Sequence, residues 1–185
     1  MNLTAKKRAG ETKGANNQIR RDGNIPAVIY AAGEPGASIE INGPEFHAAL
    51  RSIKKGHLST TIFTLDVAGK KTKAIVKGIQ YHRTSYDIIH LDFEELKDGV
   101  PVTLKVPIEC EGAADCVGIK LGGSMRQIIR SVKVECLPKD IPSQFSLGIH
   151  ELKIKQSKRL SDIALPKGIK PVATTDEVVV VIAKR

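Results

Sequence analysis

The amino-acid sequence predicts a mainly β protein with a few short helices, in which a small N-terminal β-barrel precedes a β-sandwich-like C-terminal domain. Short runs of β-branched or alternating apolar residues recur along the 185 residues, and Gly and Pro turns separate them. The clearest helical spacing of apolar residues falls in residues 42–53. All three Tyr and three of the four Phe lie in the first half, and only Phe145 lies in the second. This difference in composition indicates two domains.

The first predicted domain, residues 1–94, has the elements of a small closed barrel. A first strand at residues 2–8 leads into a segment rich in Gly, Asn and basic residues. In that segment Gly10 and Gly14 permit open backbone conformations, and Asn16 or Asn17 caps a short helix that stops at Gly23. The elements expected next are extended segments at 26–30 and 38–41, a helix at 42–53, a hairpin at 61–80 and a strand at 87–93.

Local signals support the helix and the hairpin. Pro44 suits an early helix position. The apolar residues of this helix fall at i, i+3, i+4 and i+7, and they are Phe46, Ala49, Leu50 and Ile53. Residues 61–67 and 71–80 are rich in β-branched side chains on either side of Gly69, which is the pattern of a hairpin.

The second predicted domain, residues 95–185, begins in a polar junction that contains Gly99 and Pro101. Its connections are irregular and rich in Gly and Pro, as in a β-sandwich-like domain. One short helix is expected within residues 157–165. The expected strands are residues 102–110, 131–136, 145–149 and 176–183.

Positive charge is in excess along the whole chain, with a formal net charge of +9. The excess is densest in the first twenty-one residues, where Glu11 is the only acid. Such a balance suits a polyanion such as nucleic acid, although it also serves solubility. The cations of this segment are Lys6, Lys7, Arg8, Lys13, Arg20 and Arg21.

The cysteines and the apolar runs exclude several classes of protein. The three cysteines, Cys110, Cys116 and Cys136, form no C-x-x-C pair, which indicates reduced thiols in a cytoplasmic protein. No set of four spaced ligands suggests zinc, so we expect no metal and no cofactor. No apolar run approaches the roughly 20 residues of a membrane span, and no signal peptide is evident, so no membrane association is expected.

Polar side chains gather between residues 77 and 93. Strand alternation at 87–93 sends Leu91 and Phe93, with Ile89, to the core and leaves Ile88 and the other alternate residues facing outward. The outward His90 and Asp92 would lie about 7 Å apart along the strand. If residues 77–82 form the neighbouring strand, one outward face carries Gln80, His82, His90 and Asp92.

Several uses of this face can be compared. A metal site needs a third ligand, and none is evident. Catalysis needs a nucleophile or a paired base, but the sequence has no GxSxG, no Cys near a His and no paired acids, so no catalytic residue is expected. The basic loop lacks a phosphate-binding motif. Two interpretations remain open, an ordinary solvated face and a recognition surface. On a recognition surface, Asp92 would accept hydrogen bonds from base amino groups or ribose hydroxyls.

Four stretches resemble a known family. They are "KGA" followed by an arginine and "IPAVIY" (13–30), "Q-x-H" followed by "HLDF" (80–93), "GGSMRQIIRSVKVECLPKDIP" (122–142) and "LPKGIKPV" (165–172). The order of these motifs is similar to that of the bacterial large-subunit ribosomal protein twenty-five family, in its longer two-domain form, the general-stress protein Ctc type. The resemblance covers nearly the whole chain.

The resemblance implies a non-enzymatic protein of the 50S subunit in the cytoplasm, whose N-terminal barrel binds 5S rRNA through shape, ribose hydroxyls and a few base edges. The second domain would pack on neighbouring ribosomal proteins or 23S rRNA. Phosphate contacts would come from Arg8, Lys13 and Arg20. The full set of RNA-binding residues implied is Arg8, Lys13, Gly14, Asn16, Arg20, Arg21, Tyr30, Gln80, His82, His90 and Asp92.

The chain departs from the family pattern at two positions that lower its positive charge. Residues 16–18 are Asn-Asn-Gln where Ser-Arg-Arg is common, and Tyr81 stands where Arg is usual. Arg21, Arg83 and Lys7 are candidates to compensate. The alternative function is a stress-related RNA-binding or chaperone-like protein that acts off the ribosome.

Overall fold

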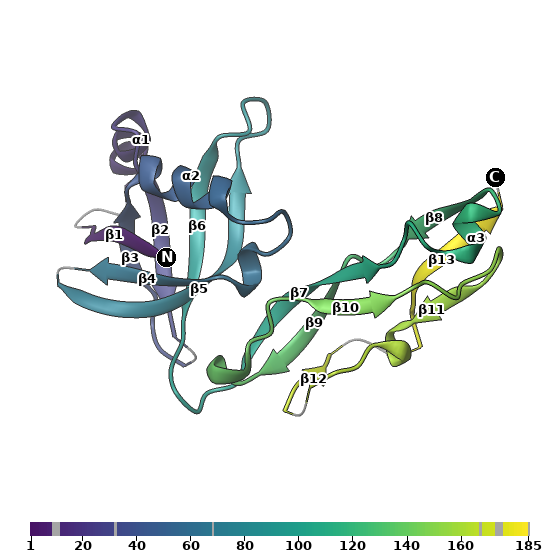
Figure 1. Cartoon of the computed structure of the whole chain (residues 1–185). Helices are drawn as coiled ribbons and strands as arrows, with labels where there is room; N and C mark the ends of the chain where they lie inside the picture. Colours follow the sequence, from purple (N-terminus) through teal and green to yellow (C-terminus); the bar gives the residue numbers. More distant parts are fainter. Residues whose placement is uncertain (9–11, 32, 68, 167, 173–175, 185) are drawn as a thin grey trace. The chain divides into compact units, whose positions relative to one another are not determined.

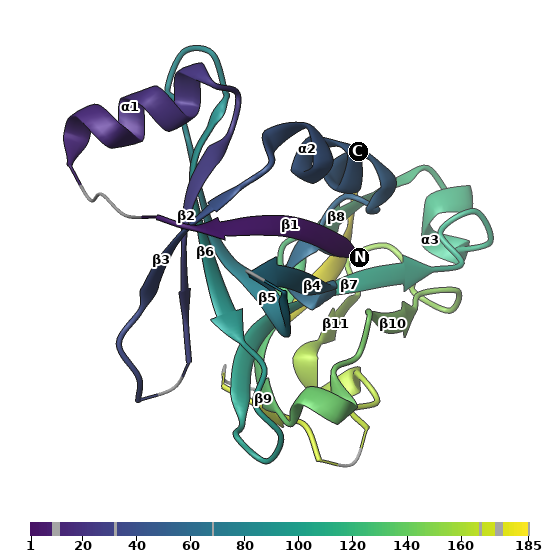
Figure 2. The same cartoon turned by 90° about the vertical axis from the view of Figure 1, so that its left-hand side faces the viewer.

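The computed structural model describes residues 1–8, 12–31, 33–67, 69–166, 168–172 and 176–184. The chain divides into two compact units, unit 1 (Met1–Val100) and unit 2 (Pro101–Arg185). Each unit is built mainly from β-strands, with short helices at its edges (Figures 1 and 2). The predicted fold class, mainly β with an N-terminal barrel and a second β-rich domain, is confirmed.

Unit 1 is a closed barrel of six strands. They are β1 (Asn2–Lys7), β2 (Ile25–Tyr30), β3 (Ala37–Ile41), β4 (Ile62–Val67), β5 (Lys70–Tyr81) and β6 (Ile88–Glu95). Neighbours around the barrel follow the order β1-β3-β2-β6-β5-β4, and a parallel pairing of β1 with β4 closes the ring. A second parallel pairing joins β2 to β6. Closure removes the open sheet edges that would otherwise invite pairing with other chains.

Apolar side chains from every strand fill the barrel, and three aromatic rings dominate its interior. Phe46, Phe63 and Phe93 are all fully buried. The Phe63 ring lies 6.1 Å from the Phe46 ring and 6.2 Å from the Phe93 ring, between ring centres, and meets Phe93 edge-on at 84°. Edge-on pairs at this distance are favourable because the positive ring edge meets the negative ring face.

Phe46 belongs to α2 (Gly43–Ser52), which covers the barrel as the sequence predicts. The Asn42 side chain caps this helix by accepting a hydrogen bond from the Glu45 amide, and Pro44 occupies its first turn. A 3-10 turn, η1 (Leu58–Thr60), then leads into β4.

The first helix, α1 (Lys13–Arg21), starts earlier than expected. Thr12 is its N-cap, and the Thr12 hydroxyl accepts from the Ala15 amide at 3.3 Å. The expectation that Asn16 or Asn17 caps this helix is therefore wrong, and so is an open conformation at Gly14, because all three residues lie within the helix. The expected stop at Gly23 is confirmed, since this residue has a φ of +79°, which L side chains rarely adopt. Gly10 lies outside the described residues.

The pairing of β5 with β6 changes register twice, between Val76 and Gly78 and between Gln80 and Tyr81. The second shift interrupts strand alternation at the start of β6. Ile88 is consequently buried in the core and Ile89 is half-buried, so the expectation that Ile88 faces outward is wrong. Beyond the shift the alternation is as predicted, and Leu91 and Phe93 are fully buried.

Unit 2 holds two small sheets, with strand orders β10-β7-β9-β12 and β11-β13-β8. Its strands are β7 (Val102–Glu111), β8 (Gly123–Gln127), β9 (Ser131–Cys136), β10 (Phe145–Gly148), β11 (Ser157–Arg159), β12 (Lys170–Pro171) and β13 (Val178–Lys184). Its short helices are α3 (Val117–Lys120) and the 3-10 turns η2 (Pro138–Asp140) and η3 (Leu160–Asp162). The long predicted strands are confirmed. The short helix expected within 157–165 is present as the single 3-10 turn η3, and β11 occupies the residues before it.

None of the helices in the described ranges is long and apolar enough to cross a bilayer.

The three cysteines are free thiols. Burial raises the pKa of Cys110, and burial together with the nearby Asp140 raises the pKa of Cys136. The raised pKa values keep the Cys110 and Cys136 thiols protonated and weakly nucleophilic, as expected of structural cysteines.

Candidate nucleic-acid interface

A row of polar side chains crosses the outer face of β5, β6 and β2. Gln80 of β5 and His90 of β6 are direct partners across the sheet, and Asp92 lies two residues further along β6. Tyr30 lies at the end of β2, where it pairs with Glu94. Gln80 is exposed, and the side chains of His90 and Asp92 keep 22% and 37% of their surface accessible. We refer to Tyr30, Gln80, His90 and Asp92 together as the polar stripe.

Gly78 makes room for the Asp92 carboxylate. The two residues are partners across β5 and β6. A Cβ atom on Gly78 would lie 2.8 Å from Asp92 Oδ2, closer than such contacts normally come. The absent side chain lets the carboxylate lie flat over β5, so glycine at this position sets the orientation of Asp92.

His90 and Asp92 contact each other within the stripe. His90 Nδ1 lies 2.9 Å from Asp92 Oδ1. The two atoms are not in hydrogen-bonding geometry, and Nδ1 is buried without a hydrogen-bond partner among the described residues. The contact places an acceptor-only group beside one that both donates and accepts.

The surroundings of Tyr30 in the stripe raise the pKa of its phenol. Burial is the largest cause that raises the pKa of its phenol, and the negative charges of Glu94 and Asp92 raise it further. The Tyr30 hydroxyl therefore stays protonated and keeps its hydrogen-bond donor over the physiological range. The stripe thus combines donors from Tyr30 and Gln80 with acceptors from Asp92 and Gln80.

The helix α1 carries positive charge beside the stripe. It has three cations and no acid, and none of its residues is buried. Lys13 and Gly14 lie exposed in its first turn and Arg21 lies exposed in its last. Both views of the structure show α1 standing off the barrel, at the same end of the barrel as the tip of the β5–β6 hairpin (Figures 1 and 2).

Arg20 attaches α1 to β6. Its Nε and Nη2 each donate a 3.1 Å hydrogen bond to the main-chain carbonyl oxygen of Ile89, and its Nη1 donates to the side chain of Asn17 at 3.2 Å. These bonds use three of the five N–H groups of the guanidinium. The side chain is exposed, so the remaining donors can reach a phosphate.

Arg8 and Asn16 form a second connection between the barrel and α1. Arg8 follows β1, and its Nη1 donates a short hydrogen bond to Asn16 Oδ1. The Nε of Arg8 is buried and has no partner among the described residues. Both side chains therefore stabilise the base of α1, a role that the sequence did not suggest.

His82 lies apart from the stripe, because β5 ends at Tyr81 and His82 begins the hairpin turn. Its Nδ1 accepts a hydrogen bond from the Ser85 amide at 3.3 Å, and the hydroxyls of Thr84 and Ser85 lie 3.2 and 3.1 Å away. Because an amide N–H can only donate, the neutral ring carries its proton on Nε2.

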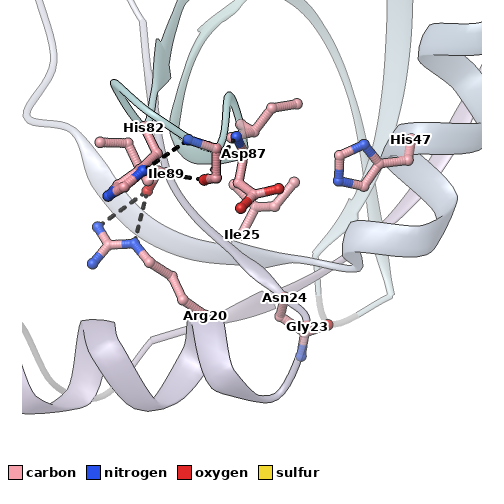
Figure 3. Close-up of a pocket in the computed structure, with 10 residues that line it drawn as sticks. Arg20, Gly23, Asn24, Ile25, His47, His82, Asp87 and Ile89 are labelled. Carbon is pink, nitrogen blue, oxygen red and sulfur yellow. Dashed lines mark hydrogen bonds between the residues drawn. The ribbon is translucent and has the colours of Figure 1, made fainter.

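A cleft of about 390 Å³ opens between α1, the start of α2 and the hairpin. Figure 3 shows Arg20 and the hairpin residue His82 on one side of this cleft and His47 on the opposite side, with Asp87 between them. Neither His47 nor Asp87 stands out in any local sequence pattern, because the two residues meet only in the folded chain.

The side chains on this face of the barrel offer groups suited to molecular recognition. In the described part of the chain, no group of three or more His, Cys, Asp or Glu is arranged to hold a metal ion. The interface instead presents exposed cations on a helix, hydrogen-bonding groups on a sheet and two exposed rings on the hairpin, Tyr81 and Tyr86. Cations suit phosphates, and mixed donors and acceptors suit ribose hydroxyls and base edges.

Comparison with known proteins gives matches to both halves of the chain. Residues 3–93 match the Ribosomal L25p family, and residues 101–185 match the family described as Ribosomal protein TL5, C-terminal domain. Over all 185 residues of both chains, the protein is 47% identical to the Large ribosomal subunit protein bL25 of Chlamydia trachomatis serovar L2. The corresponding proteins of Chlamydia muridarum and Chlamydia pneumoniae are 46% and 44% identical, again over their full length.

Proposed function

The chain belongs to the bacterial bL25 family of ribosomal proteins, in its two-domain form, and we propose on this premise that unit 1 binds 5S rRNA through the polar stripe and α1. Membership makes the protein a structural, non-enzymatic constituent of the large ribosomal subunit in the bacterial cytoplasm. Our proposal concerns which RNA the protein binds and which residues contact that RNA.

One observation carries the proposal. The cationic α1 and the polar stripe occupy neighbouring parts of one surface, and Arg20 joins α1 to β6, the strand that contributes His90 and Asp92. The helix supplies phosphate contacts, which bind any RNA, and the stripe supplies directional hydrogen bonds, which select among RNAs. The wide minor groove of an irregular RNA helix exposes ribose hydroxyls and base edges to such a sheet face.

We assign a role to each residue of the interface from the exposure of its side chain and from its hydrogen-bond partners. Lys13 and Arg21 are exposed cations suited to phosphates. Arg8, Asn16 and Arg20 position α1, and Arg20 retains free donors for a phosphate. Gly14 leaves the first turn of α1 open for close approach of the RNA backbone, since a Cβ there would have nothing within 4 Å. His82 lies at the end of the interface nearest the hairpin.

For unit 2 we propose contacts with neighbouring components of the subunit, either ribosomal proteins or 23S rRNA. Residues 101–185 contain 14 Lys and Arg against 9 Asp and Glu. Large apolar side chains are also exposed there, with Leu121 at 67% and Ile128 at 63%. Positive charge combined with exposed apolar groups suits an assembly partner better than a free surface.

Binding of the full-length chain to 5S rRNA tests the proposal directly. The affinity for a 5S rRNA transcript should exceed that for a transfer RNA mixture by at least about tenfold at physiological salt. Equal affinity for the two RNAs would contradict selective recognition of 5S rRNA. Sedimentation addresses the off-ribosome alternative, because a ribosomal constituent should stay with 50S subunits through a high-salt wash.

A further inference from the structure

The cleft between α1, α2 and the hairpin has an apolar floor and a polar rim. Ile25 and Ile88 are buried, at 2% and 7% accessibility, and they line the cleft together with the half-buried Ile89. The volume of about 390 Å³ falls within the range of small-molecule pockets, roughly 300–1,000 Å³. A flat, partly apolar group with polar edges fits this combination.

The rim offers one unused acceptor and one unused donor. No hydrogen bond or ion pair of the Asp87 carboxylate occurs within the described residues, whereas the Asp87 main chain is engaged in the hairpin turn through the His82 amide. The His82 ring directs Nδ1 to the Ser85 amide, which leaves the Nε2–H group as a donor. Asn24, also on the rim, is already committed because its amide donates to Glu40.

We propose that this cleft is a binding site for an unstacked guanine base, in which Asp87 accepts from the guanine N1–H and N2–H₂ groups and His82 donates to O6. The inference rests on the proposed function, because the base would come from the bound RNA. Arg20 lines one side of the cleft (Figure 3) and also belongs to α1, the helix proposed to bind phosphates, so the cleft adjoins the interface. His47 of α2 lies opposite Arg20 (Figure 3), so its ring would cover the base from the side of α2.

The pattern of donors and acceptors selects guanine over the other bases. The Watson–Crick edge of guanine presents an acceptor followed by two donors, which matches a donor from His82 and an acceptor carboxylate from Asp87, both in the lining of the cleft. Adenine would place its N1 acceptor against the carboxylate, and uracil offers a single N–H between two acceptors. A carboxylate that accepts only is therefore the group that discriminates. Unstacked bases read in this way are the usual targets of sequence-specific RNA recognition.

Nucleotide titrations of the full-length chain test the site without RNA. The probes are 5′-GMP, 5′-IMP, which lacks the guanine amino group, and 5′-AMP, followed by the amide NMR signals of residues 85–89. GMP should shift these signals in a saturable way and bind about tenfold more tightly than IMP or AMP. Equal binding of all three nucleotides, or no shift with any of them, would overturn the site.

Variants assign the selectivity to one side chain. Asp87→Asn should abolish the preference for GMP over IMP, because an amide replaces one acceptor oxygen with a donor. Asp98→Asn removes an exposed carboxylate elsewhere in unit 1 and should leave the preference unchanged. His47→Ala should weaken GMP, IMP and AMP to a similar extent. If Asp87→Asn keeps the full preference, Asp87 does not read the base.

The same protein samples separate this inference from the proposed function. A chain that binds 5S rRNA selectively but shows no guanine preference retains the RNA function and lacks the guanine site. A chain that prefers GMP but binds 5S rRNA no better than transfer RNA has the site without the proposed RNA target.

Discussion

Arg20 of α1 donates two hydrogen bonds, each 3.1 Å long, to the main-chain carbonyl oxygen of Ile89 in β6. No residue of α1 is buried and its apolar Ala15 and Ile19 are only half-buried, so this helix has little of the apolar packing that normally fixes a helix on a protein surface. The position of the cationic helix relative to the polar stripe therefore depends on this bond, together with the contact of Arg8 with Asn16.

Arg20→Ala should weaken 5S rRNA binding by about 1.5–3 kcal/mol, because it removes both a phosphate contact and the attachment of α1. The slope of log K against log salt should also become shallower by about one. Arg20→Lys keeps the charge but cannot reproduce the forked bond to Ile89. It should retain the slope and lose part of the affinity. An Arg20→Lys variant with unchanged affinity would show that charge alone matters.

The salt dependence of binding should be steep. With roughly five phosphate contacts, log K should fall against log salt with a slope on the order of −4. Lys13 is exposed at the start of α1, so Lys13→Ala should reduce this slope by about one at a smaller cost in affinity than Arg20→Ala. Titration at several salt concentrations measures both quantities. A flat response would argue against binding through phosphates.

Asp92→Ala should cost about 1–3 kcal/mol of 5S rRNA binding, because it removes hydrogen bonds to the RNA edge. The same change removes a negative charge from the interface and should strengthen binding to unrelated RNA. Competition between 5S rRNA and transfer RNA reports both effects, and Asp98→Ala serves as the charge-matched control. If both RNAs respond alike, Asp92 contributes only charge and takes no part in selection.

Gly78→Ala should weaken RNA binding by displacing the Asp92 carboxylate, since the new Cβ would lie 2.8 Å from Oδ2. The carboxylate can rotate away, so the free energy of unfolding should fall by no more than about 1 kcal/mol. A double-mutant cycle isolates the cause. In the Asp92→Ala background, Gly78→Ala should have little further effect on binding. A full additional loss in that background would place the role of Gly78 elsewhere.

Tyr30 should make stability depend on pH in the alkaline range. Its pKa is raised above the ordinary value of 10.0 in the folded chain, so the folded state holds the phenolic proton more tightly than the unfolded state does. The resulting stabilisation is fully present below pH 10 and is lost as the pH rises through the folded pKa. Tyr30→Phe should make the fall in the free energy of unfolding above about pH 10 less steep, measured by urea denaturation at each pH.

Asp92→Asn tests the electrostatic part of this effect. Removing a negative charge near Tyr30 should lower its pKa toward 10.0, which the ultraviolet absorbance of tyrosinate can follow. Comparison with Tyr30→Phe identifies the Tyr30 component of the titration. A curve identical to that of the parent protein would mean that Asp92 contributes nothing and that burial and Glu94 set the shift.

Local patterns predicted most of the elements of unit 1. Asn42, Pro44 and the apolar spacing after them mark α2, and β-branched runs around Gly69 mark the β4–β5 hairpin. The errors have local causes as well. Thr12 outcompetes Asn16 as the cap of α1, and β8 in unit 2 lacks the apolar alternation that would have identified it.

The sequence likewise predicted only some features of the candidate site. Alternation along β6 predicted that His90 and Asp92 face outward together, and the chain order of motifs predicted the family. Alternation failed at Ile88, because the register shift between Gln80 and Tyr81 arises from the pairing of two strands. No local pattern joins Arg20 to Ile89, which are separated by 69 positions in the chain.

Composition and periodicity within single elements were enough to predict the β-rich class, the two-part organisation, the excess of positive charge and the outward direction of Gln80, His90 and Asp92, whereas His82 lies outside the predicted face. The folded chain was needed to show which side chains position α1, how Gly78 makes room for the Asp92 carboxylate and which residues line the cleft. Those features depend on distances between segments far apart in the chain, and such distances are set when the barrel closes around its aromatic core.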